Sequence, residues 1–546
     1  MPAENDNKYD PEIVTAVPSS HSLVMRAAGL VSAAVLLSRI VGLVRDIIIK
    51  ANLAVTTLPA EAYEIAVRLP ETIFLIIAGG AIGSAFIPTF AAYFEQDDSE
   101  GGWRLFSNVI NLITVVVTTV SLLSILFAPD LVILLANEKV AANPELLPLT
   151  VRLMRIMLLS PIIFGASGVI MGALNARQHF LLPALAPTVY NIGIIAGGLL
   201  WPASEPEEAA MGFAVGTVVG ALGHIAVQLP GLWQKKAKYT AVFSLRDPGV
   251  KQVLKLMSPR VLGLSFSEVN KFLIIVLTNP MVTGSLPALN AAFRLIIMPQ
   301  GFIGQALGIA AFPTLSTLAA RGAYEEMRRI LANSLRIVLF LGLPFSAIFS
   351  ILNQPVVSLL FEWGIMGDED IALISWALLF YAIGLLPLLA LEVIARAFYA
   401  LSDTLTPVLA GGVQILIMWV LSLWFSQTIF PQQGWLPLGG LALGFSISNI
   451  VEVLLLLWLL RRKLGGIQGE SLLKGLWRMS AATLLMAGGM WLTQLNLPSP
   501  TGLRQLLMQL IIVGGLGGAI YLLTCAGLRL EELNQLWQYG RRRLNR

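Results

Sequence analysis

Long uninterrupted runs of apolar residues divide the chain, and short polar connections separate them. A helix needs about 20 apolar residues to cross a bilayer, and these runs reach or exceed that length. Because lipid admits only helices or closed barrels, and barrel strands would alternate apolar with polar residues, the runs predict transmembrane helices. There are fourteen, near residues 23–50, 64–94, 105–136, 148–174, 181–202, 208–231, 251–279, 286–318, 327–362, 371–400, 405–429, 436–461, 472–495 and 503–528.

Positive charge is distributed unevenly among the connections. Lysine and arginine gather after the sixth, eighth, twelfth and fourteenth runs, at 235–246, 321–329, 461–463 and 541–546. The connections after odd-numbered runs are almost free of them. Since positively charged connections stay in the cytoplasm, the pattern predicts an even number of spans and two cytoplasmic termini. It also accounts for the basic clusters, so we expect no nucleic-acid partner.

Short motifs recur in the same order in the two halves of the chain, at a nearly constant offset of 224 to 226 residues. Their prolines pair as Pro88 with Pro313, Pro129 with Pro355, Pro161 with Pro387 and Pro183 with Pro407. The offset spans six helices, an even number, so the halves share one orientation. We therefore predict an all-α polytopic membrane protein. It has fourteen transmembrane helices, arranged as two parallel six-helix lobes around a central cavity plus two C-terminal helices.

The repeat sets the predicted domains. They are a disordered cytoplasmic tail (1–20), an N-lobe (21–232), a C-lobe (233–465), helices 13 and 14 (466–530) and a basic cytoplasmic tail (531–546). The first tail is acidic and lacks the basic-then-apolar order of a signal peptide. Two parallel lobes that face each other favour alternating access over a channel, because a channel more often places identical subunits around a pore.

Composition limits the chemistry. Apolar residues make up 56% of the chain and charged residues 12%, against about 25% charged in soluble domains. The single cysteine, Cys525, excludes an intrachain disulfide. His224 is expected to be packed and hydrogen-bonded rather than part of a proton relay. We see no phosphate loop, metal cluster or nucleophile triad and no room for an ATPase domain. We therefore expect no cofactor, and coupling to the membrane potential or to a cation gradient.

Charged residues inside the first run are the strongest functional signal. An ionised side chain at the centre of a membrane helix costs about 2.5–3.5 kcal/mol and is usually kept for function. Arg39, Asp46 and Lys50 share one helical stripe, with Arg45 to one side, and Gly42 lets a neighbour approach closely. Asp46 can pair with one of these cations and only lock the helix. The cations outnumber it, so we expect Arg39 and Arg45 to bind an anion.

Other runs add charges of both signs. We expect Glu61 and Glu64 near the outer surface, in contact with solvent, and Arg68 inside. Arg294 has no partner within its own run, and a guanidinium matches the geometry of a phosphate. Two further couples have the spacing of structural ion pairs, Glu268 with Lys271 and Glu392 with Arg396. The interior leans positive, so the expected substrate is an anion.

These motifs together resemble those of a known family. Residues 38–46, 68–70 and 80–88 resemble the amino-terminal signature of the MurJ/MviN lipid II flippases. Residues 294–313 and 395–407 are similar to that family's eighth span and its junction of spans 10 and 11. The resemblance covers about residues 22 to 460 and agrees with fourteen spans. It implies the fold of the multidrug/oligosaccharidyl-lipid/polysaccharide exporter superfamily.

The resemblance also implies a function. Members move undecaprenyl-diphosphate-linked disaccharide pentapeptide, lipid II, from the inner to the outer leaflet of the bacterial cytoplasmic (inner) membrane for peptidoglycan synthesis. The protein would thus be a transporter and not an enzyme, working among membrane lipids, with cell-wall synthesis proteins as candidate partners. Helices 13 and 14 would form a groove for the lipid tail.

The resemblance implies a substrate site as well. Arg39, Arg45 and Arg294 would meet the diphosphate, and Asp46, Glu61 and Arg68 complete the predicted substrate-binding set. The chain departs from the family at Phe74, Leu75 and Gly79, where many members have a basic residue and a glutamate. That departure leaves open a flippase for another lipid-linked oligosaccharide. The alternative from a different class is a cation-coupled multidrug exporter, whose interior would favour acidic and aromatic linings.

Overall fold

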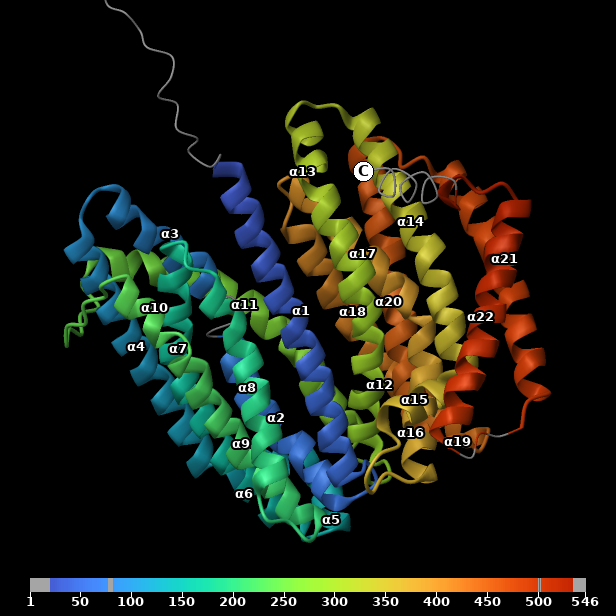
Figure 1. Cartoon of the computed structure of the whole chain (residues 1–546), viewed down its shortest axis with the longest axis horizontal. Helices are drawn as coiled ribbons and strands as arrows, with labels where there is room; N and C mark the ends of the chain where they lie inside the picture. Colours follow the sequence, from blue (N-terminus) through green and yellow to red (C-terminus); the bar gives the residue numbers. More distant parts are fainter. Residues whose placement is uncertain (1–19, 77–81, 499, 501, 534–546) are drawn as a thin grey trace, which may run out of the picture.

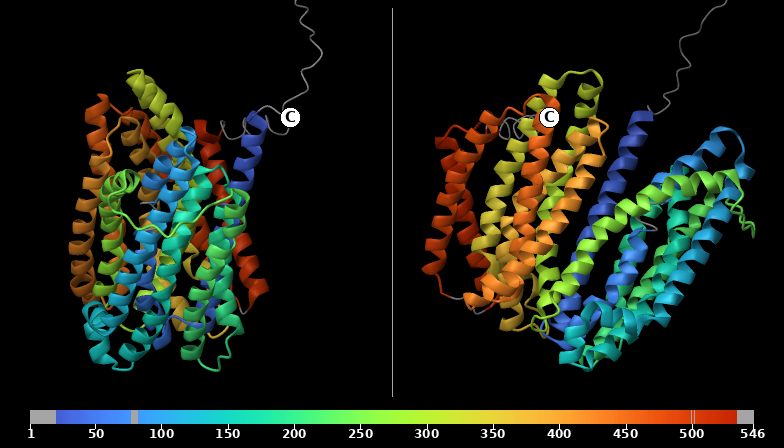
Figure 2. Two further views of the ribbon diagram at one scale, coloured as in Figure 1. Left: turned by 90° about the vertical axis from the view of Figure 1, so that its left-hand side faces the viewer. Right: turned by 180° about the vertical axis from the view of Figure 1, so that it is seen from behind.

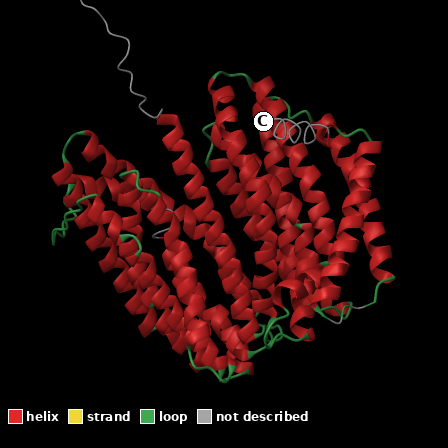
Figure 3. Ribbon diagram, in the orientation of Figure 1, coloured by secondary structure: helices red, strands yellow, loops and turns green. Residues whose placement is uncertain are grey.

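The computed structural model describes residues 20–76, 82–498, 500 and 502–533, and within them every regular element is a helix (Figure 3). The helices are α1 (Ser20–Leu53), α2 (Leu58–Ile76), α3 (Ile82–Glu95), α4 (Ser99–Leu126), α5 (Ala128–Ala142), α6 (Leu146–Met157), α7 (Leu159–Ala176), α8 (Leu181–Leu200), α9 (Pro206–Ala226), α10 (Leu229–Gln234), α11 (Pro248–Leu277), α12 (Ser285–Pro299), η2 (Gln300–Gln305), α13 (Ala306–Ala320), α14 (Tyr324–Ile351), α15 (Asn353–Phe361), α16 (Asp368–Ile383), α17 (Leu385–Ala400), α18 (Leu405–Trp424), η3 (Phe425–Ile429), α19 (Phe430–Gln432), α20 (Pro437–Leu464), α21 (Gly469–Leu495) and α22 (Leu503–Gly527). The two η elements are π-helical segments within longer helices.

In the described residues, each of the fourteen predicted spans coincides with one helix or with consecutive helices, and part of the second span, residues 77–81, lies outside them. By length and composition, nine described helical segments are apolar enough to cross a membrane, and α16 with α17, bent by 46°, makes a tenth. The other four spans are α1, α2 with α3, α11 and α21. The first two carry the charged residues singled out above, which shows why an apolarity criterion alone passes over them.

The helices form two lobes (Figure 1). Helices α1 to α10 make the N-lobe and α12 to α20 the C-lobe, with α21 and α22 along the outer side of the C-lobe. The lobes separate toward one end, the diverging end, where α1 begins and α22 finishes, and they meet at the other, the converging end. Helix α11 runs obliquely between the lobes (Figure 2). Its Val250 and Ile275 belong to the N-lobe core and its Leu277 to the C-lobe core.

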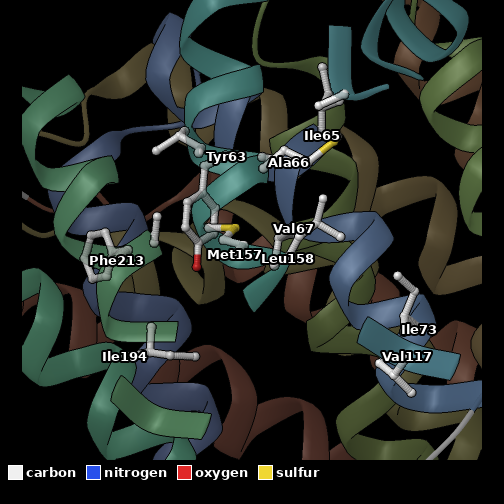
Figure 4. Close-up of a cluster of buried hydrophobic side chains, with 14 of the residues drawn as sticks. Tyr63, Ile65, Ala66, Val67, Ile73, Val117, Met157, Leu158, Ile194 and Phe213 are labelled. Carbon is white, nitrogen blue, oxygen red and sulfur yellow. The ribbon is translucent and has the colours of Figure 1, made fainter. Parts of the chain in front are cut away.

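Each lobe has its own core. Figure 4 shows part of the N-lobe core, where Tyr63 of α2 meets Phe213 of α9 edge to face, with ring centroids 6.2 Å apart. A second core fills the C-lobe around α16, α17 and α20. A third joins α14 to α21 and α22, and the Tyr521 hydroxyl donates to the Phe340 carbonyl there at 2.8 Å. The last two helices are thus attached to the C-lobe through α14.

Glycines bring α8 and α9 into backbone contact. A Cβ atom on Gly197 would lie 2.3 Å from the Cα of Gly216, and one on Gly193 would lie 2.3 Å from the Cα of Gly220. Membrane helices associate through such small residues because lipid supplies no hydrophobic drive between them. This contact holds α8, which supplies a side chain to the site described below, against the rest of the N-lobe.

Replacing Gly197 by valine is expected to destabilise the N-lobe by about 1–3 kcal/mol, because the new side chain must push α8 away from α9. The measurement is thermal unfolding of the purified protein together with the yield of monodisperse material. Gly514→Val on α22 is the matched control, because no atom lies within 4 Å of a Cβ built there. Equal unfolding temperatures for the two variants would contradict the prediction.

Some sequence predictions lie outside the described residues. Residues 1–19 and 534–546, most of the two predicted tails, are among them, as is Gly79. The described start of the C-terminal segment is tied to the C-lobe. Arg336 of α14 bonds to Glu532 through its Nε and lies 3.4 Å from Glu531 through Nη1.

Candidate functional site at the lobe interface

Charged side chains lie along α1 from the diverging toward the converging end. Arg39 is exposed, and its Nη2 donates to Gln305 Oε1 of η2 at 2.9 Å. Asp46 and Lys50, farther along the same stripe, are buried. A Cβ on Gly301 would lie 2.1 Å from Arg39 Nη1, so a glycine in η2 makes room for the guanidinium. π-helical segments are often found at functional sites, and this one places C-lobe backbone against Arg39.

Asp46 lies between two arginines from opposite lobes. Its Oδ1 is 2.8 Å from Nη2 of Arg45, and its Oδ2 is 3.0 Å from Nη1 of Arg294 on α12. Arg45 also donates to Asn191 Oδ1 of α8 at 2.9 Å. The predicted absence of a partner for Arg294 holds only within its own helix, because its partner comes from the other lobe. Two cations and one carboxylate leave this trio with a net charge of +1.

Two buried glutamates of α2 join the lobes nearer the converging end. Lys50 Nζ lies 2.6 Å from Glu64 Oε1, and Asn290 of α12 donates to Glu64 Oε2 at 2.8 Å. Lys139 of α5 lies 2.6 Å from Glu61 Oε1, and the backbone N–H of Gly284 donates to Oε2 at 2.8 Å. The prediction that these glutamates contact solvent is wrong, because they are 1% and 6% exposed. Their partners come from helices far away in sequence.

Removing Lys139 is expected to destabilise the protein strongly. Lys139→Ala would leave the Glu61 carboxylate buried without its cation, and breaking a buried pair in this way costs about 3–5 kcal/mol. Thermal unfolding measures the effect. Lys474→Ala is the control, because its pair with Glu470 is exposed and such pairs contribute about 0–1 kcal/mol. Similar unfolding temperatures for both variants would contradict the prediction.

Arg68 is buried, as predicted, and lies on α2 one turn beyond Glu64. Its Nη1 is 3.6 Å from Glu71 Oε2, and its Nε has no hydrogen-bond partner among the described atoms. Arg68 is therefore the least satisfied arginine of the predicted set. The Nε–H of Arg68 therefore remains available to donate a hydrogen bond.

The central charges enclose a very small cavity. Arg45, Asp46, Lys50, Glu64 and Arg294 line it, and the remaining walls are Ile49, Tyr63, Val67, Glu71, Tyr190 and Ile194. Its volume is about 20 Å³, which holds on the order of one water. In this conformation the charged groups satisfy one another. An anion that takes the place of the carboxylate between the two arginines must separate Asp46 from at least one of them.

Several other charged or polar residues are structural. Glu268 pairs with Lys271 at 2.7 Å and Glu392 with Arg396 at 2.5 Å, which confirms both predicted couples. His224 is packed and bonds through Nδ1 to Ser167 Oγ at 2.7 Å, also as predicted. Phe74 packs against Phe164 in the N-lobe, with ring centroids 4.3 Å apart and the rings tilted by 47°. The uncharged residue at position 74 therefore serves packing within the lobe.

Asp403 organises the turn between α17 and α18. Its carboxylate accepts from the Thr406 backbone N–H at 3.0 Å and Oγ1 at 2.6 Å, and it bonds to Lys463 of α20. Burial acts to raise the pKa of Asp403, but the hydrogen bonds from Lys463 and Thr406 outweigh it and lower the pKa to about 2. The motif at 403–407 thus ties the start of α18 to α20 within the C-lobe.

Sequence reasoning missed Asn191, Asn290, Gln305 and Asp370. Asp370 of α16 accepts three bonds of 2.8 Å from the far lobe, from the backbone N–H groups of Val55 and Thr56 and from the Thr56 hydroxyl. The predicted loop 363–370 showed only an absence of cations. An uncharged or acidic residue whose partner is hundreds of positions away leaves no local signal.

Comparison with known proteins identifies the family. The sequence model described as "Lipid II flippase MurJ" matches residues 50–510. The chain belongs to the lipid II flippase MurJ family. It is 28% identical over 533 residues to a probable lipid II flippase MurJ of Vibrio cholerae, covering 93% of this chain and 97% of the relative. It is also 28% identical over 494 residues to the lipid II flippase MurJ of Burkholderia cenocepacia, covering 88% and 92%.

Solved structures of the family and its superfamily share the fold. A lipid II flippase MurJ in an inward closed conformation superposes with a TM-score of 0.74 at 24% identity, over 91% of this chain and 98% of the other. An inward-facing multidrug resistance MATE transporter of the MOP superfamily gives 0.65 at 16% identity, over 79% and 96%. Both likenesses confirm the all-helical membrane-protein fold predicted from the sequence.

Proposed function

We propose that the protein is a lipid II flippase that works by alternating access between two leaflets. The observation that carries this proposal is the trio of Arg45, Asp46 and Arg294, which joins the lobes and keeps a positive charge. Arginine binds diphosphate through paired, charge-assisted hydrogen bonds. Membership in the family supplies the head group and the lipid carrier.

The trio offers a direct link between binding and movement. A diphosphate that arrives from the diverging end meets the exposed Arg39 first. It then competes with Asp46 for Arg45 and Arg294. Because the Arg294–Asp46 pair spans the lobes, the substrate changes an interlobe contact when it displaces Asp46. A ligand shifts a conformational equilibrium only through such differential contacts.

The orientation and energy source belong to the same proposal. The basic connections support a topology with both termini in the cytoplasm of a bacterium, and the family supports the inner membrane as the location. The diverging end then faces the cytoplasm. Outward movement of an anionic head group is favoured by a negative interior by about 2.3 kcal/mol per charge per 100 mV, so the membrane potential can drive it, and a cation gradient is the alternative source.

The lipid tail and the partners complete the proposal. The apolar outer faces of α21 and α22, beside the C-lobe, suit a groove for the tail, and cell-wall synthesis proteins are the candidate partners. A related lipid-linked oligosaccharide would use the same diphosphate contacts and differ only in the glycan. Cationic drugs are disfavoured, because two arginines and one carboxylate face the interface.

The test is complementation of a bacterium depleted of its own flippase, with accessibility of lipid II at the outer leaflet as the readout. We expect the protein to restore growth and outer-leaflet lipid II. Intact walls and normal lipid II levels on deleting this gene in its own host would overturn the proposal. Restored export of a different lipid-linked glycan, without lipid II, would favour the related substrate.

A further inference from the structure

One buried carboxylate stands apart from the others. Seven Asp or Glu side chains are buried in the described residues: Asp46, Glu61, Glu64, Glu268, Asp370, Glu452 and Glu532. Five of them have a cation within 4.0 Å, and Asp370 accepts backbone N–H groups. Glu452 of α20 has neither an ion pair nor a hydrogen bond to any described group, although only 7% of it is exposed.

Glu452 lies where α18 and α20 pack side by side in the C-lobe (Figure 1). The two backbones touch at Gly444, where a Cβ would lie 2.8 Å from the Ser422 nitrogen. Farther along α20, the Glu452 carboxyl rests 3.6 Å from a Cβ built on Gly411 of α18. The neighbouring Gln414 is already bonded to Ser448 at 2.8 Å. Helix α18 carries no ionisable residue.

Charged groups on the other packed helices are engaged elsewhere or lie at helix ends. On α17, Glu392 pairs with Arg396, and Glu392 also accepts a hydrogen bond from Gln300 Nε2 at 3.1 Å. The two side chains lie against Gly304 and Gly308. Of the remaining charges on helices against α20, Asp370 bonds to residues 55–56, Arg294 to Asp46, Arg336 to Glu531 and Glu532, and Lys463 to Asp403, and Arg462 lies over the face of Trp458. The others lie at helix ends, away from the middle of α20: Asp368 and Glu369 at the start of α16, Glu325, Glu326, Arg328 and Arg329 at the start of α14, and Arg461 in the last turn of α20. Tyr381 packs among Phe293 and Phe445.

Glu452 also lies deep in the bilayer. It is twelve residues from the last residue of α20, about 18 Å along the helix. An unpaired carboxylate at such a place is neutralised rather than left ionised, because the free energy of burying the charge exceeds that of binding a proton. An ionisable residue inside a membrane is, by default, a candidate for ion or proton handling.

We propose that Glu452 is a proton-binding site of the C-lobe, occupied in this conformation and emptied when α18 and α20 move apart. The proton comes from water and returns to water, and no other bond changes. Coupling this proton to lipid II movement rests on the proposed function; binding of the proton does not.

Infrared difference spectroscopy of the full-length protein in lipid tests the site. At neutral pH we expect the wild type to show the carbonyl stretch of a protonated carboxyl. Glu452→Gln should lose this band. The control Glu470→Gln should keep it, because the Glu470 carboxylate is exposed. The thermal stability of the wild type should fall as pH rises, since the folded state holds a proton that the unfolded state releases, and this fall should be smaller in Glu452→Gln. A wild type without the band, or a band that survives in Glu452→Gln, would overturn the proposal.

Lipid II flipping in proteoliposomes then tests coupling. We expect the wild-type rate to depend on pH and the Glu452→Gln rate to lose that dependence. If the carbonyl band is present in the wild type and lost in Glu452→Gln, while the flipping rate of neither protein depends on pH, coupling is refuted and the proton site stands. If neither protein moves lipid II although the band is present, the proposed function fails and the proton site again stands.

Discussion

Arg294→Ala is expected to abolish lipid II flipping while the protein still inserts and folds. Without Arg294, Asp46 neutralises Arg45 and the net charge of the trio falls from +1 to zero. The diphosphate loses at least one bidentate, charge-assisted contact, at about 1.5–3 kcal/mol per hydrogen bond. Two such bonds amount to a loss of about a hundredfold or more in the affinity for the head group. Complementation and outer-leaflet lipid II measure it.

Three further variants make this result specific. Arg152→Ala is the matched control, because the Arg152 side chain is 65% exposed and comes no closer than 4.0 Å to Glu207. This variant should move lipid II at the wild-type rate. Arg294→Lys keeps the charge but loses the planar guanidinium fork, so its rate of lipid II flipping should lie between those of the wild type and the alanine variant. Arg39→Ala is expected to lose flipping as well, because in the proposed path this exposed arginine meets the head group first. Wild-type flipping by both Arg294→Ala and Arg39→Ala would refute an anion-binding interface.

The architecture was predictable because its signals are local. Each apolar run by itself predicts a membrane span, and each basic connection by itself predicts on which side of the membrane it lies. The prolines at 161 and 387 sit in equivalent places because both halves repeat the same sequence of helices. Breaks within the spans are less local. The bend of 46° between α16 and α17 and the π-helical segment η2 depend on packing against neighbours.

The candidate site was predictable in its charges and not in its pairings. Arg39, Arg45 and Arg294 were chosen because an arginine in an apolar run is costly wherever the helix ends up. Whether a carboxylate is solvated depends on what covers it. Glu61 is near the end of a predicted span and was placed in solvent, yet Lys139 and the N–H of Gly284 enclose it. Only the three-dimensional arrangement brings these partners together.

At the converging end, the carboxylate of Asp370 joins the two lobes. Asp370 uses Oδ1 for the three bonds from Val55 and Thr56 and Oδ2 for the N–H of Gly367. The N–H of Ile365 adds a bond to the Ala51 carbonyl at 2.9 Å. A state that is open at the converging end requires the lobes to separate here, so every one of these interlobe bonds must break. The stability of the present conformation therefore depends on Asp370.

Asp370→Ala is expected to shift the protein toward the state in which the converging end is open. The variant leaves two backbone N–H groups without their acceptor, at about 1–3 kcal/mol each, and a net change of about 3 kcal/mol alters the ratio of the two states about a hundredfold. Spin labels on cysteines replacing the exposed Glu205 and Gln433 report the interlobe distance, since the native Cys525 is buried. We expect longer distances in Asp370→Ala and none of this lengthening in Asp368→Ala, whose side chain is exposed on the same turn. An unchanged distribution would refute the role given to Asp370 and would show that the remaining interlobe contacts, among them those of Glu61, Glu64 and Asp46, hold the converging end closed without it.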